Sequence, residues 1–162
     1  MSIVIPQIPK ISRKIDSIFL HASATRANID DNITTADADI GVKEITQWHK
    51  ERGFKSIGYH AVIRRNGAIE LGRPWVEVGA HAANYNANSF GLVMVGGVDA
   101  KNNAENNYRP EQFDSIVALL HAIREVYPKN IIRGHNEVAN KACPCFDVPT
   151  FCRLFHIERD TR

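Results

Sequence analysis

Three residues of types that bind zinc stand where segments of regular structure are expected to end. His21 closes one apolar run, His135 closes another, and Cys143 lies in the loop that follows. Two imidazoles and one thiolate can hold zinc and leave a fourth position for water, as catalytic zinc sites do. A histidine at a strand end is more often a hydrogen-bonded structural residue, and this spacing matches no short metal motif. The residue types alone leave both interpretations open.

The other two cysteines, Cys145 and Cys152, are crowded near the end of the chain with Cys143. An odd number of closely spaced cysteines does not indicate a disulfide framework. We therefore expect Cys145 and Cys152 to be small buried side chains or free thiols.

The composition is that of one globular domain. The chain has 162 residues, of which 44% are hydrophobic and 23% charged. The formal net charge of +2 is too small to make nucleic acid the default partner. The apolar runs are much shorter than the roughly 18 residues of a membrane span, so we expect no membrane insertion. Asp16 interrupts the only run that resembles a secretory signal, so we expect residues 1–16 to form an N-terminal arm of a protein made in the cytoplasm.

The elements that must position these residues follow from apolar periodicity and turn signals. Asn66-Gly67 predicts a type I′ hairpin turn, and Pro110 suits the first position of a helix that Pro128 ends. Strands are predicted at 17–23, 60–65, 68–71, 90–95 and 131–135, helices at 38–52, 110–127 and 148–156, and surface loops at 24–37 and 99–109. Strands mixed with helices predict the α/β class, as a single domain with a central mixed β-sheet flanked by helices.

Four sequence blocks in this order carry a family resemblance: Phe19–Thr25, Gly58–Gly67, Gly79–Ala82 and Gly134–Pro144. Together they resemble the zinc-dependent N-acetylmuramoyl-L-alanine amidases of the bacteriophage T7 lysozyme type, in the superfamily that includes the peptidoglycan recognition proteins. The resemblance spans roughly residues 17–153. It implies that residues 17–162 form a zinc amidase domain, which agrees with the predicted order of elements.

The resemblance also implies an activity. Its members hydrolyse the amide between N-acetylmuramic acid and L-alanine in peptidoglycan, with Zn²⁺ as cofactor. His21, His135 and Cys143 match the zinc ligands, and Tyr59 and Lys141 match two further residues that the family needs. A cation such as Lys141 can stabilise the oxyanion that forms during amide hydrolysis. Tyr59 can orient the attacking water or pass a proton to the leaving amine.

Several other polar residues have more than one candidate role. His81 and Asn84 lie in a loop of small residues and are candidates for substrate contact, although His81 equally suits a structural hydrogen bond. Alternation along a strand places His60 on the face opposite Tyr59, as a structural residue. His49 is expected at the surface or boundary of a helix. Glu137 is a candidate partner of a ligand histidine or a surface residue.

The combined expectation is a monomeric phage endolysin that acts on peptidoglycan. It would be made in the host cytoplasm and reach the cell wall after holin-type release. One alternative is a regulatory module that binds peptidoglycan or a phage RNA polymerase, since a family member inhibits such a polymerase and residues 1–16 could serve that role. Another alternative is an amidase that acts on soluble muropeptides.

Overall fold

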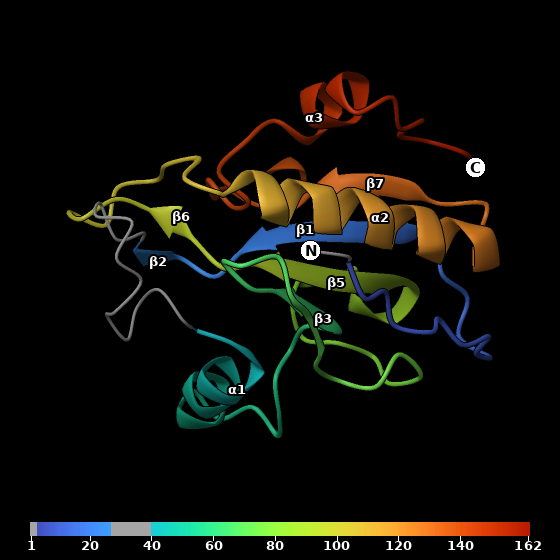
Figure 1. The fold of residues 1–162 in the computed structure, drawn as a ribbon. Helices are drawn as coiled ribbons and strands as arrows, with labels where there is room; N and C mark the ends of the chain where they lie inside the picture. The colour runs from blue at the N-terminus through green and yellow to red at the C-terminus, as the bar shows by residue number, and fades with distance from the viewer. Residues whose placement is uncertain (1–2, 27–39) are drawn as a thin grey trace.

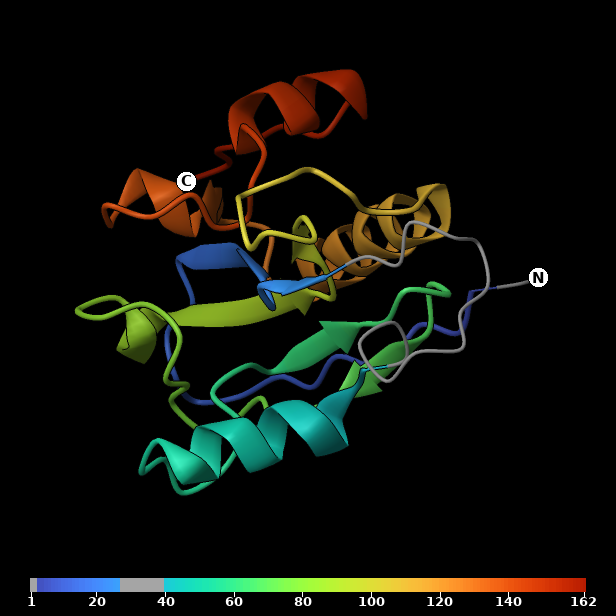
Figure 2. The ribbon, with the colours of Figure 1, turned by 90° about the vertical axis from the view of Figure 1, so that its left-hand side faces the viewer.

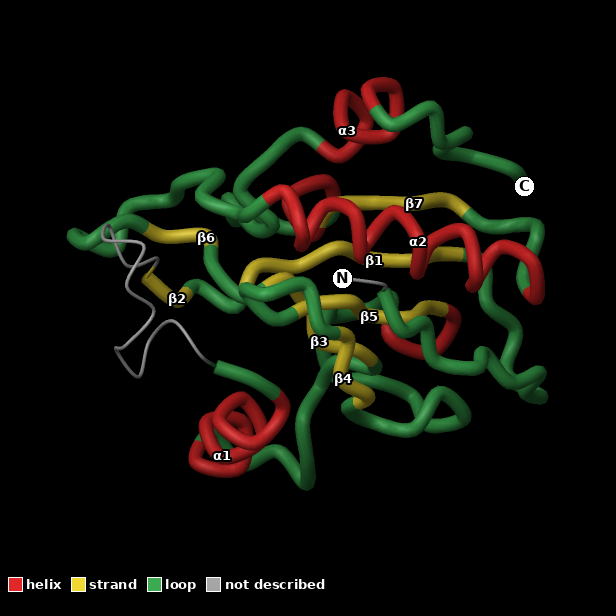
Figure 3. Tube along the Cα trace, viewed as in Figure 1, coloured by secondary structure: helices red, strands yellow, loops and turns green. Residues whose placement is uncertain are grey.

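A five-stranded sheet forms the centre of the protein in the computed structural model, which describes residues 3–26 and 40–162. The strand order is β4-β3-β5-β1-β7 (Figures 1 and 3). The strands are β1 (Ser17–Ala22), β3 (Ala61–Ile63), β4 (Ile69–Leu71), β5 (Ser89–Met94) and β7 (Ile131–Gly134). Only β4 runs antiparallel to its neighbour, so the sheet is mixed, as predicted.

The parallel strands bring their carboxyl ends to one edge of the sheet. β1 lies between β5 and β7, and His21 near its end pairs with Val93 of β5. Leu20 pairs with Gly134, the last residue of β7, which places His135 just beyond the edge beside His21. Ligands in sheets of this kind bind outside the carboxyl ends of the strands.

Helices cover both faces of the sheet. α2 (Pro110–Val126) and α3 (Val148–Leu154) lie on one side and α1 (Val42–Glu51) on the other (Figure 2). Two short 3₁₀ helices, η1 (Asn86–Asn88) and η2 (His135–Glu137), adjoin β5 and β7. The single-domain α/β class is therefore confirmed. Among the described residues, no helix combines the length and the apolar character that a membrane span requires.

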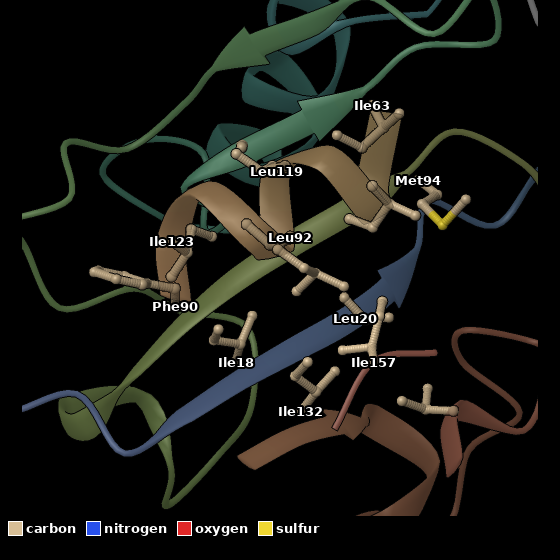
Figure 4. Packing of buried hydrophobic residues seen from close by; sticks show 14 of the residues in the cluster. Ile18, Leu20, Ile63, Phe90, Leu92, Met94, Leu119, Ile123, Ile132 and Ile157 are labelled. Atoms are coloured by element: carbon tan, nitrogen blue, oxygen red, sulfur yellow. The ribbon is translucent and has the colours of Figure 1, made fainter. Parts of the chain in front are cut away.

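Alternation along the strands separates the core from the site. Ile18 and Leu20 of β1 pack with Phe90 and Leu92 of β5 in the larger apolar cluster beneath α2 (Figure 4). Successive side chains of a strand point to opposite faces. His21 therefore points to the α1 side of the sheet.

The hairpin turn differs from the prediction. A type I′ turn needs positive φ at both central residues, but of Asn66 and Gly67 only Gly67 has one, at +87°. The Gly67 N–H donates to the Arg64 carbonyl, and the Arg64 N–H donates to the Ala68 carbonyl. The turn is thus a longer loop in which glycine takes the left-handed position, and the type I′ prediction was wrong.

Two short strands were also missed. β2 (Thr25–Arg26) pairs with β6 (Gly97–Val98) in a separate two-stranded sheet, where a surface loop was predicted from residue 24. The rest of that predicted loop, residues 27–37, and the predicted helix start at 38 lie outside the described residues. Two-residue strands carry too little periodicity to be found from sequence.

The described part of the N-terminal segment packs along the body. Ile8 and Ile15 are buried, and the Tyr127 hydroxyl donates to the Pro9 carbonyl at 2.7 Å. The Arg13 guanidinium donates to the carbonyl oxygens of Ala87 and Trp75, each at 2.9 Å.

Candidate active site

Three potential metal ligands meet at the carboxyl edge of the sheet. One ligand atom from each of His21, His135 and Cys143 lies within 4.8 Å of the other two. The Cys143 Sγ lies 3.6 Å from the His21 Nδ1. Residues far apart in the sequence are thus brought together by the pairing of β1 with β7 and by the loop that follows β7.

Local hydrogen bonds hold the two candidate ligands that lie outside the strands, His135 and Cys143. Glu137 accepts a hydrogen bond from the Gly134 N–H at 2.7 Å and forms an ion pair with Arg159, which fixes the turn carrying His135. The Asn136 N–H donates to the Cys143 carbonyl at 2.7 Å. Glu137 therefore acts on the backbone beside His135.

The electrostatic environment keeps both histidines neutral. Burial lowers the pKa of His21 well below its usual value, and the neighbouring His81, His135 and Lys141 lower it further. Burial and Lys141 also lower the pKa of His135. A neutral imidazole has the lone pair that a metal ligand needs.

Cys143 is a half-buried thiol with a donor aimed at its sulfur. Burial raises its pKa to about 11, against the opposing effect of the Ala22 N–H. That N–H lies 3.1 Å from the sulfur. Binding of a metal displaces the thiol proton, and the Ala22 N–H is then in place to stabilise the thiolate.

The donor set fits zinc. Zn²⁺ takes nitrogen at about 2.0–2.1 Å and thiolate sulfur at about 2.3 Å in tetrahedral sites, so two such donors lie about 3.6 Å apart. The observed 3.6 Å between the His21 Nδ1 and the Cys143 Sγ matches this separation. Three protein ligands also leave a position for water or substrate.

Tyr59 and Lys141 line the same cavity as the candidate ligands His135 and Cys143. The ring centroid of Tyr59 is 5.0 Å from that of His21. Burial, and to a smaller extent Cys143, raises the pKa of Tyr59, so its hydroxyl stays protonated at neutral pH. Lys141 is exposed, and its charge lowers the pKa of both His21 and His135.

Comparison with known proteins identifies the family of the chain. The family model for N-acetylmuramoyl-L-alanine amidase matches residues 11–146. The chain belongs to the N-acetylmuramoyl-L-alanine amidase family. This amidase is 46% identical over 136 residues to the endolysin of Enterobacteria phage K11, with 84% of each chain covered. It is 44% identical over 133 residues to the endolysin of Escherichia phage T7, with 82% of each chain covered.

Solved structures agree in fold. The amidase LysC from Clostridium intestinale URNW aligns with a TM-score of 0.72 and 26% identity, covering 93% of this amidase and all of LysC. Drosophila PGRP-LB aligns with a TM-score of 0.67 and 22% identity, covering 96% of this amidase and 91% of the other chain. The family resemblance and the fold predicted from the sequence are both confirmed.

The cavity of the amidase, with a volume of about 570 Å³, also includes His81 and Asn84. Asn84 is exposed. His81 is only 8% exposed, and its Nδ1 and Nε2 lie within hydrogen-bond distance of His21 and Ser89. Any substrate contact by His81 is therefore left to the carbon edge of its ring.

Sequence reasoning missed part of the cavity wall. Arg52 and Phe54 line it, at the end of α1. His49 also lines it and was predicted at the surface or boundary of its helix, but it is only 6% exposed. Its Nδ1 accepts a hydrogen bond from the Gly58 N–H at 2.8 Å. The prediction for His49 was wrong because α1 packs its histidine against the loop before β3, a contact that helical periodicity does not reveal.

The remaining polar predictions have clear outcomes. His60 is fully buried: its Nδ1 accepts from the Gly91 N–H, and its Nε2 lies 2.8 Å from the Glu77 carbonyl, which confirms a structural role. Cys145 and Cys152 are free thiols, Cys152 fully within the core.

Proposed function

We propose that this amidase is a phage endolysin that uses a bound zinc ion to hydrolyse the amide between N-acetylmuramic acid and L-alanine in peptidoglycan. The observation that carries the proposal is the convergence of His21, His135 and Cys143 at a cavity whose wall includes His135, Cys143, Tyr59 and Lys141. The similarity to the endolysins of phages K11 and T7 supports it.

Each residue has a role that its position allows. Zinc, when bound, would polarise the amide carbonyl and lower the pKa of a water molecule. Lys141 places a positive charge beside the ligands, where it stabilises the negative charge that develops on the carbonyl oxygen. The protonated Tyr59 hydroxyl orients the attacking water or passes a proton to the leaving amine. Asn84, exposed at the cavity rim, is proposed to contact the glycan or the peptide.

The proposal extends to the place of action. The protein would be made in the host cytoplasm, as a monomer, and reach peptidoglycan after holin-type release. Expression with and without a phage holin tests this route, because lysis should require the holin. Lysis without a holin would contradict it.

The decisive experiment measures metal content and bond cleavage together. We expect about one zinc per chain, and release of free L-alanine amino groups from purified sacculi. Cys143→Ser should lose both, because a hydroxyl is a poor zinc ligand beside a thiolate. Release of new sugar reducing ends in place of amino groups, or full cleavage by Cys143→Ser, would contradict the proposal.

Two comparisons separate the alternatives. An enzyme for soluble muropeptides would cleave a soluble fragment much faster than intact sacculi, whereas an endolysin should clear sacculi efficiently. A module that only binds peptidoglycan or a polymerase has no need of Lys141 and Tyr59 beside a ligand triad. Such a module would release no amino groups from either substrate.

A further inference from the structure

A second buried imidazole lies behind the candidate ligand His21. The His81 Nδ1 is 2.9 Å from the His21 Nε2, while the His21 Nδ1 faces Cys143. His21 is thus held by one of its nitrogens and offers the other to the metal site. The two rings are perpendicular, at 85°, with their centroids 5.0 Å apart.

The donor and the acceptor of each hydrogen bond in this chain can be assigned by starting from the Tyr85 carbonyl. The Ser89 hydroxyl lies 2.8 Å from the Tyr85 carbonyl, which can only accept, so Ser89 donates its single proton there. The Ser89 Oγ must then accept from the His81 Nε2, 3.2 Å away. A neutral His81 that carries its proton on Nε2 has a bare Nδ1. That nitrogen accepts from the His21 Nε2–H, and the His21 Nδ1 is left with a free lone pair.

We propose that His81 is a positioning residue that, through this chain from the Tyr85 carbonyl, holds His21 in the tautomer and orientation needed to bind the metal. The proposal rests on the proposed function only in taking His21 as a zinc ligand. It assigns His81 a task inside the protein, distinct from contact with the substrate.

The surroundings hold the His81 ring in place for this task. Its backbone N–H donates to the Asn86 Oδ1 at 2.9 Å, as does that of Ala82. The Phe19 ring packs against it, with centroids 5.9 Å apart. Ser89 is fully buried, so water does not readily replace the acceptor it provides.

Loss of the His81 nitrogens should weaken metal binding. Without an acceptor at its Nε2, His21 would bury an unsatisfied N–H or shift its proton to Nδ1, and the shifted tautomer cannot bind a metal through Nδ1. Replacing such outer partners of a ligand histidine typically costs roughly 10–100-fold in metal affinity.

The test uses the full chain and two matched substitutions. His81→Phe keeps a ring but removes both nitrogens. His60→Phe makes the same change in a neighbouring buried histidine, whose ring centroid is 6.0 Å from that of His81. The hydrogen bonds of His60 go to the Gly91 N–H and the Glu77 carbonyl, and none goes to His21. The zinc dissociation constant is measured by competition with a chromophoric chelator. We expect His81→Phe to weaken zinc binding by roughly 10–100-fold and His60→Phe to leave it close to that of the unchanged protein.

A second measurement needs no variant. Nitrogen-15 NMR of the metal-free protein should find the proton of His21 on Nε2 and that of His81 on Nε2. A proton on the His21 Nδ1, or equal zinc affinities for the two variants, would overturn the proposal. Failure of the unchanged protein to bind zinc would instead overturn the proposed function, so the two failures are distinguishable.

Discussion

Gly91 of β5 lies directly against the ring of His81. A methyl group built on Gly91 would come within 2.5 Å of the His81 Cγ and 2.6 Å of its Cδ2. Glycine in a strand interior weakens the strand and often marks a close approach. Here the missing side chain provides the space that the His81 ring occupies behind His21.

Gly91→Ala should therefore impair metal binding as well as folding. The added methyl group would displace the His81 ring and lengthen the hydrogen bond between His81 and His21. We expect the free energy of unfolding to fall by about 1–3 kcal/mol, the usual cost of overpacking, and the zinc affinity to fall with it. Urea titration and chelator competition measure the two effects.

A double-mutant cycle with His81→Ala identifies the cause. If the clash is with the His81 ring, Gly91→Ala should cost much less stability once that ring is removed, so the two changes should not be additive. Additive losses would mean that Gly91 is needed for another reason.

The meeting of His21 and His135 could be predicted from local signals, whereas the assignment of the three candidate ligands, Cys143 included, came from the family resemblance. His21 and His135 end apolar runs, and strand ends of a parallel arrangement meet at one edge. The hydrogen bond between His21 and His81 could not be predicted from the sequence, because it depends on how the loop before β5 folds over the sheet. Gly91 within an otherwise apolar strand was the one signal that could have pointed to it.

The long elements of the fold could also be predicted, whereas details that depend on tertiary packing could not. Long segments such as α2 and β5 have enough periodicity to be recognised, and they lie close to the predicted ranges. The type I′ turn predicted at Asn66-Gly67 was wrong because the same dipeptide suits loops of different length. The prediction that His49 lies at the surface or boundary of its helix was wrong, because the burial of a helix face depends on tertiary packing that the helix sequence does not specify.

Tyr59→Phe should separate catalysis from metal binding. It removes one hydroxyl and none of the three ligand atoms, so the zinc content should stay at the level of the unchanged protein. General acid–base groups contribute about 10²–10⁴-fold to a rate, and we expect kcat to fall by at least about 10²-fold. Amino-group release from sacculi measures kcat. Loss of zinc from the variant would contradict a role confined to the reaction.

Acid should destabilise the metal-free protein through His60. Burial, opposed by the Glu77 carbonyl and assisted by Arg13 and Arg73, lowers the pKa of His60 to about 4. The unfolded chain takes up this proton near the usual pKa of about 6.5, so between pH 6.5 and 4 it binds more protons than the folded protein. Stability therefore falls as the pH falls through this range, by about 3 kcal/mol at most from this group.

Urea titrations at several pH values, with chelator present, measure this dependence. His60→Asn removes the titrating ring, so its stability should change less between pH 7 and pH 4 than that of the unchanged protein. His49 and His81 remain in both proteins, and the difference between the two curves belongs to His60. Parallel curves would show that His60 is not the group responsible.

Lys141→Met should slow the reaction without removing the metal. A charge that acts on the developing oxyanion stabilises the transition state more than the bound substrate, so kcat should fall and KM should change little. Loss of one such stabilising group costs about 10²–10³-fold in kcat. Lys101→Met makes the same change of net charge in an exposed loop and should leave kcat unaltered. A rise in KM with unchanged kcat would instead assign Lys141 to substrate binding, because uniform binding affects both states equally.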